Sequence, residues 1–93
     1  MIMVPLESRH LSVIAAIEAA QISNPLNFRN LQELASLPAF RGFVAVPDFS
    51  AEPIGYVIVL AGGGSADIVS VAVAPELLRR GVATRLLLFA LAN

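Results

Sequence analysis

The sequence lacks cysteine and lysine, and only 14% of its residues are charged. Without cysteine, disulfides and thiolate metal sites are excluded, and we expect a cytoplasmic location. Without lysine, the phosphate loop of nucleoside triphosphatases is excluded, because that loop uses a lysine beside the phosphates. The longest unbroken apolar run covers residues 86–92, seven residues. About 20 are needed to cross a bilayer, so we expect no membrane span. The N-terminus has no basic leader before a long apolar core, so we expect no secretory signal.

Apolar side chains are abundant in this short chain. They make up 57% of the 93 residues, whereas soluble domains typically contain roughly 45–50%. We expect one domain, and a domain of this size buries only about 60% of its unfolded surface. Some apolar surface should therefore remain exposed and support self-association. The formal net charge is −1, yet three of the six arginines lie within residues 79–85. This focused charge argues against a broad nucleic-acid surface and favours one local anion.

The hydrophobic pattern predicts a mixed α+β fold in the order β-α-α-β-β-β-α. We expect strands at 2–4, 43–46, 54–61 and 67–73, and helices at 8–21, 28–36 and 81–92. Ser8 is the expected N-cap of the first helix. We expect seven inward-facing residues on the first two helices: Leu11, Ile14, Ile17, Phe28, Leu31, Leu34 and Ala35. The glycines at 62–64, followed by Ser65, predict a hairpin turn.

The most informative motif is the stretch 79–88, which follows the apolar run 68–75 directly. Gly81 opens the last helix, whose first-turn N–H groups and positive dipole end attract anions. Gly81 has no Cβ to hold a ligand away from the backbone, and Ala83 keeps the next turn nearly as bare. The motif predicts a phosphate site at this helix start. The alternative is a plain strand-to-helix turn with solvated arginines.

Two other features indicate no separate chemistry. The glycines at 62–64 precede a strand, whereas a nucleotide-binding loop precedes a helix, so a nucleotide-binding α/β domain is disfavoured. His10 is the single histidine, and we expect it to be an exposed residue of the first helical turn. No histidine pair or carboxylate cluster has the spacing of a metal site, so we expect no metal.

The element order and the segment 71–84 closely resemble the GNAT superfamily of acyl-CoA-dependent N-acetyltransferases. The pyrophosphate signature of that family is Arg or Gln, two variable residues, Gly, one variable residue, then Gly or Ala. Gly81 and Ala83 match its last two positions, whereas Leu78 stands where Arg or Gln is usual. The N-terminal segment 4–18 and the strand residues 55–57 are also similar to the ribosomal-protein N-terminal acetyltransferase type. The resemblance implies a twisted, mainly antiparallel sheet flanked by helices.

The resemblance also implies a site for acetyl-CoA as co-substrate. The implied cofactor-binding residues are Val71, Ala72, Val73, Arg79, Arg80, Gly81, Val82, Ala83 and Thr84. Backbone N–H groups of 79–84 would hold the pyrophosphate. A free backbone N–H of 71–73 would polarise the thioester carbonyl. Asp67 stands at the start of the same strand, where histone-type members place the carboxylate that acts as general base. The alternative for Asp67 is a solvated residue at the end of a hairpin.

The implied function is transfer of an acetyl group to a primary amine, on a protein N-terminus or on a small molecule. Members of the family usually continue beyond the helix that ends near residue 92, with another strand, a helix and two more strands. We therefore expect residues 1–93 to be the N-terminal, cofactor-binding portion of a single acetyltransferase domain, lacking the C-terminal part of the fold. The alternative is a non-catalytic GNAT-like fragment or interaction module that at most binds CoA.

Overall fold

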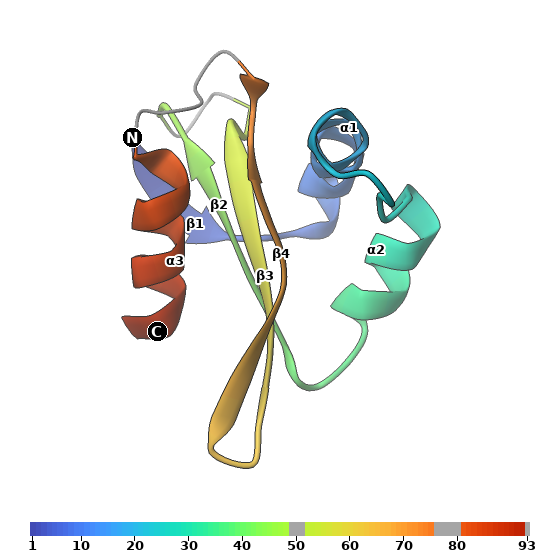
Figure 1. Ribbon diagram of the computed structural model, residues 1–93, viewed down its shortest axis with the longest axis vertical. Helices are drawn as coiled ribbons and strands as arrows, with labels where there is room; N and C mark the ends of the chain where they lie inside the picture. Colours follow the sequence, from blue (N-terminus) through green and yellow to red (C-terminus); the bar gives the residue numbers. More distant parts are fainter. Residues whose placement is uncertain (49–51, 76–80, 93) are drawn as a thin grey trace.

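The computed structural model describes residues 1–48, 52–75 and 81–92. One antiparallel sheet contains four strands in chain order: β1 (Ile2–Pro5), β2 (Phe40–Val46), β3 (Gly55–Gly62) and β4 (Ser65–Val73). The helical elements are η1 (Ser8–His10), α1 (Leu11–Gln21), α2 (Phe28–Ala35) and α3 (Val82–Ala92). This order confirms the predicted succession of strands and helices. Helices α1 and α2 cover one face of the sheet, and α3 covers the other (Figure 1).

Strand β3 lies at the centre of the hydrophobic core. Its side chains alternate between the two faces, as the period of two of a strand requires. Tyr56 and Ile58 pack with α1 and α2, whereas Val57 and Val59 pack with α3. A strand buried on both faces has a continuous apolar sequence rather than an alternating one. This explains the unbroken apolar run in β3.

Helix α1 packs on the sheet through the stripe predicted from the sequence, because Leu11, Ile14 and Ile17 are all buried. The beginning of this helical segment differs from the prediction. Glu7, not Ser8, is the N-cap, and the three residues that follow form a 3-10 turn. The Nδ1 atom of His10 accepts the backbone N–H of Glu7 at 2.9 Å. His10 is therefore a buried capping residue, and the expectation that it is exposed is wrong.

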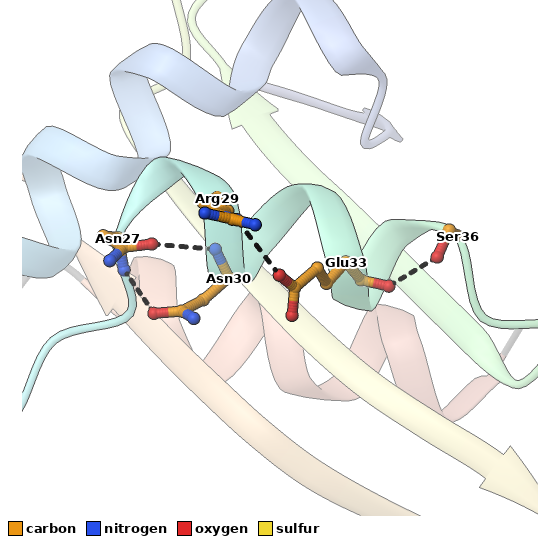
Figure 2. Close-up of polar contacts among 5 residues, drawn as sticks. All are labelled: Asn27, Arg29, Asn30, Glu33 and Ser36. Atoms are coloured by element: carbon orange, nitrogen blue, oxygen red, sulfur yellow. Dashed lines mark hydrogen bonds and ion pairs between the residues drawn. The ribbon is translucent and has the colours of Figure 1, made fainter.

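Helix α2 is held at its start by a reciprocal cap (Figure 2). The Asn30 N–H donates to Asn27 Oδ1 at 2.8 Å, and the Asn27 N–H donates to Asn30 Oδ1 at 3.2 Å. The predicted inward face is only partly confirmed. Leu31 is buried and Leu34 half-buried, whereas Phe28 and Ala35 are exposed. Because α2 lies at the outer side of its layer, only a narrow stripe of this short helix is covered.

The glycine-rich segment between β3 and β4 forms the predicted hairpin. Gly62 pairs with Ser65, so Gly63 and Gly64 make a two-residue turn. Their φ angles of 58° and 80° lie in the left-handed region that glycine adopts without strain. The turn is followed by the strand β4, as predicted, whereas a nucleotide-binding loop would be followed by a helix.

Helix α3 packs on its face of the sheet through Val82 and Leu86, which are buried against β2, β3 and β4. The rings of Phe43 and Phe89 meet edge to face, with centroids 5.0 Å apart. The opposite side of the helix stays open, since Leu88 and Leu91 are 64% and 63% exposed. This exposed apolar surface agrees with the surplus of apolar residues in the composition.

Candidate functional site

The start of α3 is the place where the sequence predicts an anion site. Gly81 has a φ of 74°, and its carbonyl accepts the Arg85 N–H at 3.1 Å, which begins the helical hydrogen-bond ladder. The first N–H groups of a helix, here those of Val82, Ala83 and Thr84, have no carbonyl partner inside the helix. A Cβ placed on Gly81 would meet no atom of the described residues within 4 Å, so these residues leave the space beside this backbone open. Arg79 and Arg80 lie outside the described residues.

The end of β4 lies against this helix start. Val73 is buried in the same cluster as Val82 and Leu86. In the described part of the chain, β4 pairs with β3 alone and forms one edge of the sheet. An edge strand presents backbone N–H and C=O groups on its unpaired side. The predicted carbonyl-polarising segment, Val71 to Val73, therefore lies on an open edge next to the helix start.

A β-bulge interrupts β4 just before this segment. Ile58 pairs with Ser70, but the next residue of β3, Val59, pairs with Ile68. Val69 is therefore an extra residue, which bends the strand and changes where the neighbouring side chains point. Sequence periodicity did not reveal this bulge, because Ile68 to Val71 are apolar or small whichever way the strand turns.

A cleft of about 500 Å³ lies beside the bulge. Six residues line it: Leu26, Asn30, Glu33, Leu34, Leu37 and Val69. Glu33 is the single charged residue of this lining. Its carboxylate lies 3.5 Å from the Arg29 guanidinium, and both side chains are mostly exposed (Figure 2). The cleft thus offers an apolar wall with one acidic and one amide side chain at its edge.

A buried polar cluster connects α1 with the sheet. Glu18 is only 1% exposed, and its Oε1 atom accepts hydrogen bonds from the hydroxyls of Ser70, at 2.7 Å, and Tyr56. Its Oε2 atom accepts the backbone N–H of Leu26 at 2.9 Å. Sequence reasoning missed this cluster. The available signal was a glutamate on the stripe of Leu11 and Ile14, since positions 11, 14 and 18 share one helix face.

The hydroxyl of Tyr56 is strongly held in its protonated form. Burial raises its pKa well above the usual value of 10, and the hydrogen bond to Glu18 raises the pKa further. The contact between the Tyr56 and Ser70 hydroxyls, 3.2 Å apart, lowers the pKa of Tyr56 but does not cancel this rise. Tyr56 is therefore a hydrogen-bond donor to Glu18 at all physiological pH values.

Asp67, the predicted general base, lies on the hairpin side of the bulge. It is exposed and pairs with Leu60 of β3. The segment 71–73 lies on the other side of the bulge along the same strand. The structure thus puts Asp67 and the predicted carbonyl-polarising backbone on one strand, with the cleft residue Val69 between them. The role of Asp67 as base stays a prediction.

The described residues contain neither a metal cluster nor a membrane helix. Nowhere in ranges 1–48, 52–75 and 81–92 do three histidine or carboxylate side chains gather closely enough to hold an ion. No helix within these ranges combines the length and the apolar character that crossing a bilayer requires.

The fold is similar to that of several solved N-acetyltransferases. The ribosomal-protein-S18-alanine N-acetyltransferase of Escherichia coli superimposes with a TM-score of 0.83 at 18% identity, covering 95% of this chain and 55% of that one. NAA60 of Arabidopsis thaliana, solved with a bisubstrate analogue, gives a TM-score of 0.79 at 17% identity. The match covers 98% of this chain and 64% of NAA60. The aminoglycoside 6'-N-acetyltransferase AAC(6')-Ih of Acinetobacter baumannii gives a TM-score of 0.74 at 17% identity. The match covers 98% of this chain and 69% of that enzyme. The chain thus spans little more than half the length of the first of these proteins.

No curated protein sequence matches the chain significantly. The model of the acetyltransferase (GNAT) family, in contrast, matches residues 11–92, from the beginning of α1 to the end of α3. This match includes the start of α3, the edge strand β4, its bulge and the cleft beside it. The chain belongs to the GNAT family of acetyltransferases.

Proposed function

We propose that this chain uses acetyl-CoA to acetylate a primary amine. The observation that carries the proposal is the left-handed Gly81 at the start of α3. No described residue lies within 4 Å of its Cβ position, and the end of β4 packs against this helix start. Family membership supports the choice of acetyl-CoA as the anion-bearing co-substrate. The reaction would take place in the cytoplasm, with which the cysteine-free sequence is compatible.

Backbone groups would bind the co-substrate. The N–H groups of residues 79–84, with the positive end of the α3 dipole, would hold the pyrophosphate. The open edge of β4 at Val71, Ala72 and Val73 would place a backbone N–H against the thioester carbonyl, where charge develops during transfer. Acetyl-CoA supplies the acyl group and a thiolate that can leave. The proposed binding of the pyrophosphate to this backbone depends on Gly81, because any residue with a Cβ is strained at its φ of 74°.

The cleft beside α2 would take the acceptor. Its apolar wall suits an aliphatic or peptide chain, and Glu33 at its edge suits an acceptor that carries positive charge. Asp67 would remove the proton from the ammonium before the nitrogen attacks the carbonyl, and this proton transfer is general base catalysis. Two acceptor types should be compared, a peptide N-terminus and a small-molecule amine. They correspond to the names of the S18-alanine and aminoglycoside enzymes described above.

A second candidate is a CoA-binding interaction module without catalysis. The exposed Leu88 and Leu91 of α3 favour it, because an apolar patch of this kind commonly marks an association surface. The proposal that residues 1–93 are the N-terminal, cofactor-binding portion of one domain predicts that further chain covers this surface.

Titration calorimetry with acetyl-CoA, followed by a thiol-release assay, distinguishes these candidates. The assay uses a peptide with an N-terminal alanine and an aminoglycoside as acceptors. Binding together with amine-dependent release of CoA supports the enzyme, and binding without release supports the module. An absence of binding would contradict both.

A further inference from the structure

We propose that Glu18 is a positioning residue that fixes the acceptor cleft. Its carboxylate joins the α1–α2 connection to the bulged part of β4, and so it holds together the two sides between which the acceptor enters. The inference rests on the proposed acetyl transfer and extends it to a residue that does not contact either substrate.

The geometry assigns this role through two atoms of one side chain. Oε2 accepts the N–H of Leu26, and Oε1 accepts the hydroxyl of Ser70. Leu26 lines the cleft from the helical side, and Val69, the residue next to Ser70, lines it from the sheet. One rigid carboxylate group therefore sets the separation of the two walls.

Fold stability alone gives a poor account of a glutamate here. The side chain is 1% exposed, and its three donors are one backbone N–H and two hydroxyls, all neutral. A buried carboxylate among neutral donors is costly, and an apolar residue of similar size, introduced together with apolar partners, is often as stable or more stable. The apolar surroundings of α1 would accommodate such a residue, since Ile14 and Ile17 are neighbours on the same helix. What an apolar residue could not do is bind Leu26 and Ser70 at once.

Two substitutions separate this geometric role from charge and from simple packing. Glu18→Met keeps the volume and removes every hydrogen bond to Leu26 and Ser70. Glu18→Gln keeps the geometry without the charge, because its amide carbonyl can accept the Leu26 N–H while its NH₂ donates to the hydroxyl oxygens of Ser70 and Tyr56. Glutamine should therefore rescue the function that methionine loses.

We expect Glu18→Met to raise KM for the amine about tenfold, the effect of roughly one lost hydrogen bond to a charged group. The Kd for acetyl-CoA should stay within about twofold, since the start of α3 lies on the opposite face of the sheet. Hydrogen exchange at the Leu26 amide should become about tenfold faster in Glu18→Met. Glu18→Gln should keep all three quantities within about threefold of the parent protein.

If Glu18→Met fails to fold, Ser70→Ala decides, because it removes the link to β4 and leaves the Leu26 bond intact. It should raise the amine KM several-fold without changing Kd for acetyl-CoA. Equal changes in both substrate constants, unchanged amine KM in these variants, or failure of glutamine to rescue would overturn the positioning role. A parent protein that binds no acetyl-CoA and releases no thiol would instead contradict the proposed acetyltransferase activity itself, whatever the Leu26 exchange shows.

Discussion

Gly55 of β3 lies directly beneath Leu86 of α3. A Cβ on Gly55 would be 3.2 Å from Leu86 Cδ1 and 3.1 Å from the backbone oxygen of Ala72. Both distances are tighter than ordinary van der Waals contacts, and the Ala72 oxygen belongs to the sheet and cannot rotate away. The close packing of α3 on the sheet therefore depends on the missing side chain at Gly55. This contact holds the helix start beside the end of β4, where the cofactor is proposed to bind.

Gly55→Ala should destabilise the protein by about 1–3 kcal/mol, the usual range for overpacking a core. Urea denaturation measures the free energy of unfolding. Gly62→Ala is the matched control, because it lies in the same strand with nothing within 4 Å of its Cβ position. The control should change the free energy by less than about 0.5 kcal/mol. Equal effects at the two positions would show that α3 does not press on Gly55.

Gly81→Glu should remove measurable affinity for CoA while helix content stays nearly constant. The substitution adds bulk and negative charge where the pyrophosphate is proposed to bind, at the positive end of the α3 dipole. Calorimetry measures the binding, and circular dichroism the helix content.

The control for this variant is Gly81→Ala, which shares the backbone strain at a φ of 74° but adds no charge. Alanine there should cost about 1–2 kcal/mol of stability and retain measurable CoA binding. Undiminished CoA affinity in Gly81→Glu would exclude this helix start as the phosphate site.

Asp67→Asn should preserve CoA binding and lower the rate of acetyl transfer most strongly at neutral pH. An amide cannot take the proton of the amine, so the contribution of general base catalysis, typically about 10²- to 10⁴-fold, is lost. At high pH the amine in solution is already deprotonated, so the rate of acetyl transfer by the variant should approach that of the parent protein. The pH dependence of kcat/KM tests this expectation. If both proteins show the same profile, Asp67 is only a solvated residue of the hairpin.

The stability of the protein should fall as the pH drops below about 6.5, the ordinary pKa of histidine, because of His10. Burial, followed by the charge of Arg9, lowers the pKa of His10 below 6.5, and Glu7 partly opposes this. The folded protein then binds fewer protons at this site than the unfolded chain. The contribution of His10 is therefore complete above pH 6.5 and is lost as the pH falls through the folded-state pKa.

Urea denaturation at several pH values measures this decline. His10→Gln supplies a control that does not titrate, because its side-chain carbonyl can still accept the Glu7 N–H as in a capping box. The glutamine variant should show a flatter profile over this range. Parallel profiles for the two proteins would mean that other groups cause the decline.

Self-association should involve the open side of α3. The double variant Leu88→Glu with Leu91→Glu should lower the average mass in concentrated solution, because it places charges on the exposed apolar surface. Leu37→Glu, on the α2 side and 44% exposed, is the control and should leave association unchanged. Sedimentation velocity over a range of concentrations measures the mass. A parent protein that stays monomeric throughout, with no binding of an apolar dye, would contradict the expectation.

Local sequence patterns predicted the elements that depend on local physics. The apolar run of β3, the inward stripe of α1 and the glycine turn at Gly63 and Gly64 each follow from periodicity or from backbone sterics over a few residues. Gly81 was recognised in the same way, as the residue at the start of α3, which begins at Val82. Those patterns, together with the resemblance carried by residues 71–84, were sufficient to indicate the GNAT fold.

Tertiary structure decided which residues meet across the chain. Glu18 joins Tyr56 and Ser70 over separations of 38 and 52 residues, and no local period encodes such contacts. The same is true of Phe28 and Ala35, which have the spacing of a buried stripe but lie exposed, because none of the described elements covers that side of α2. Burial depends on the neighbours that the fold supplies, so a sequence pattern can mark a side chain as apolar or charged without showing what it will contact.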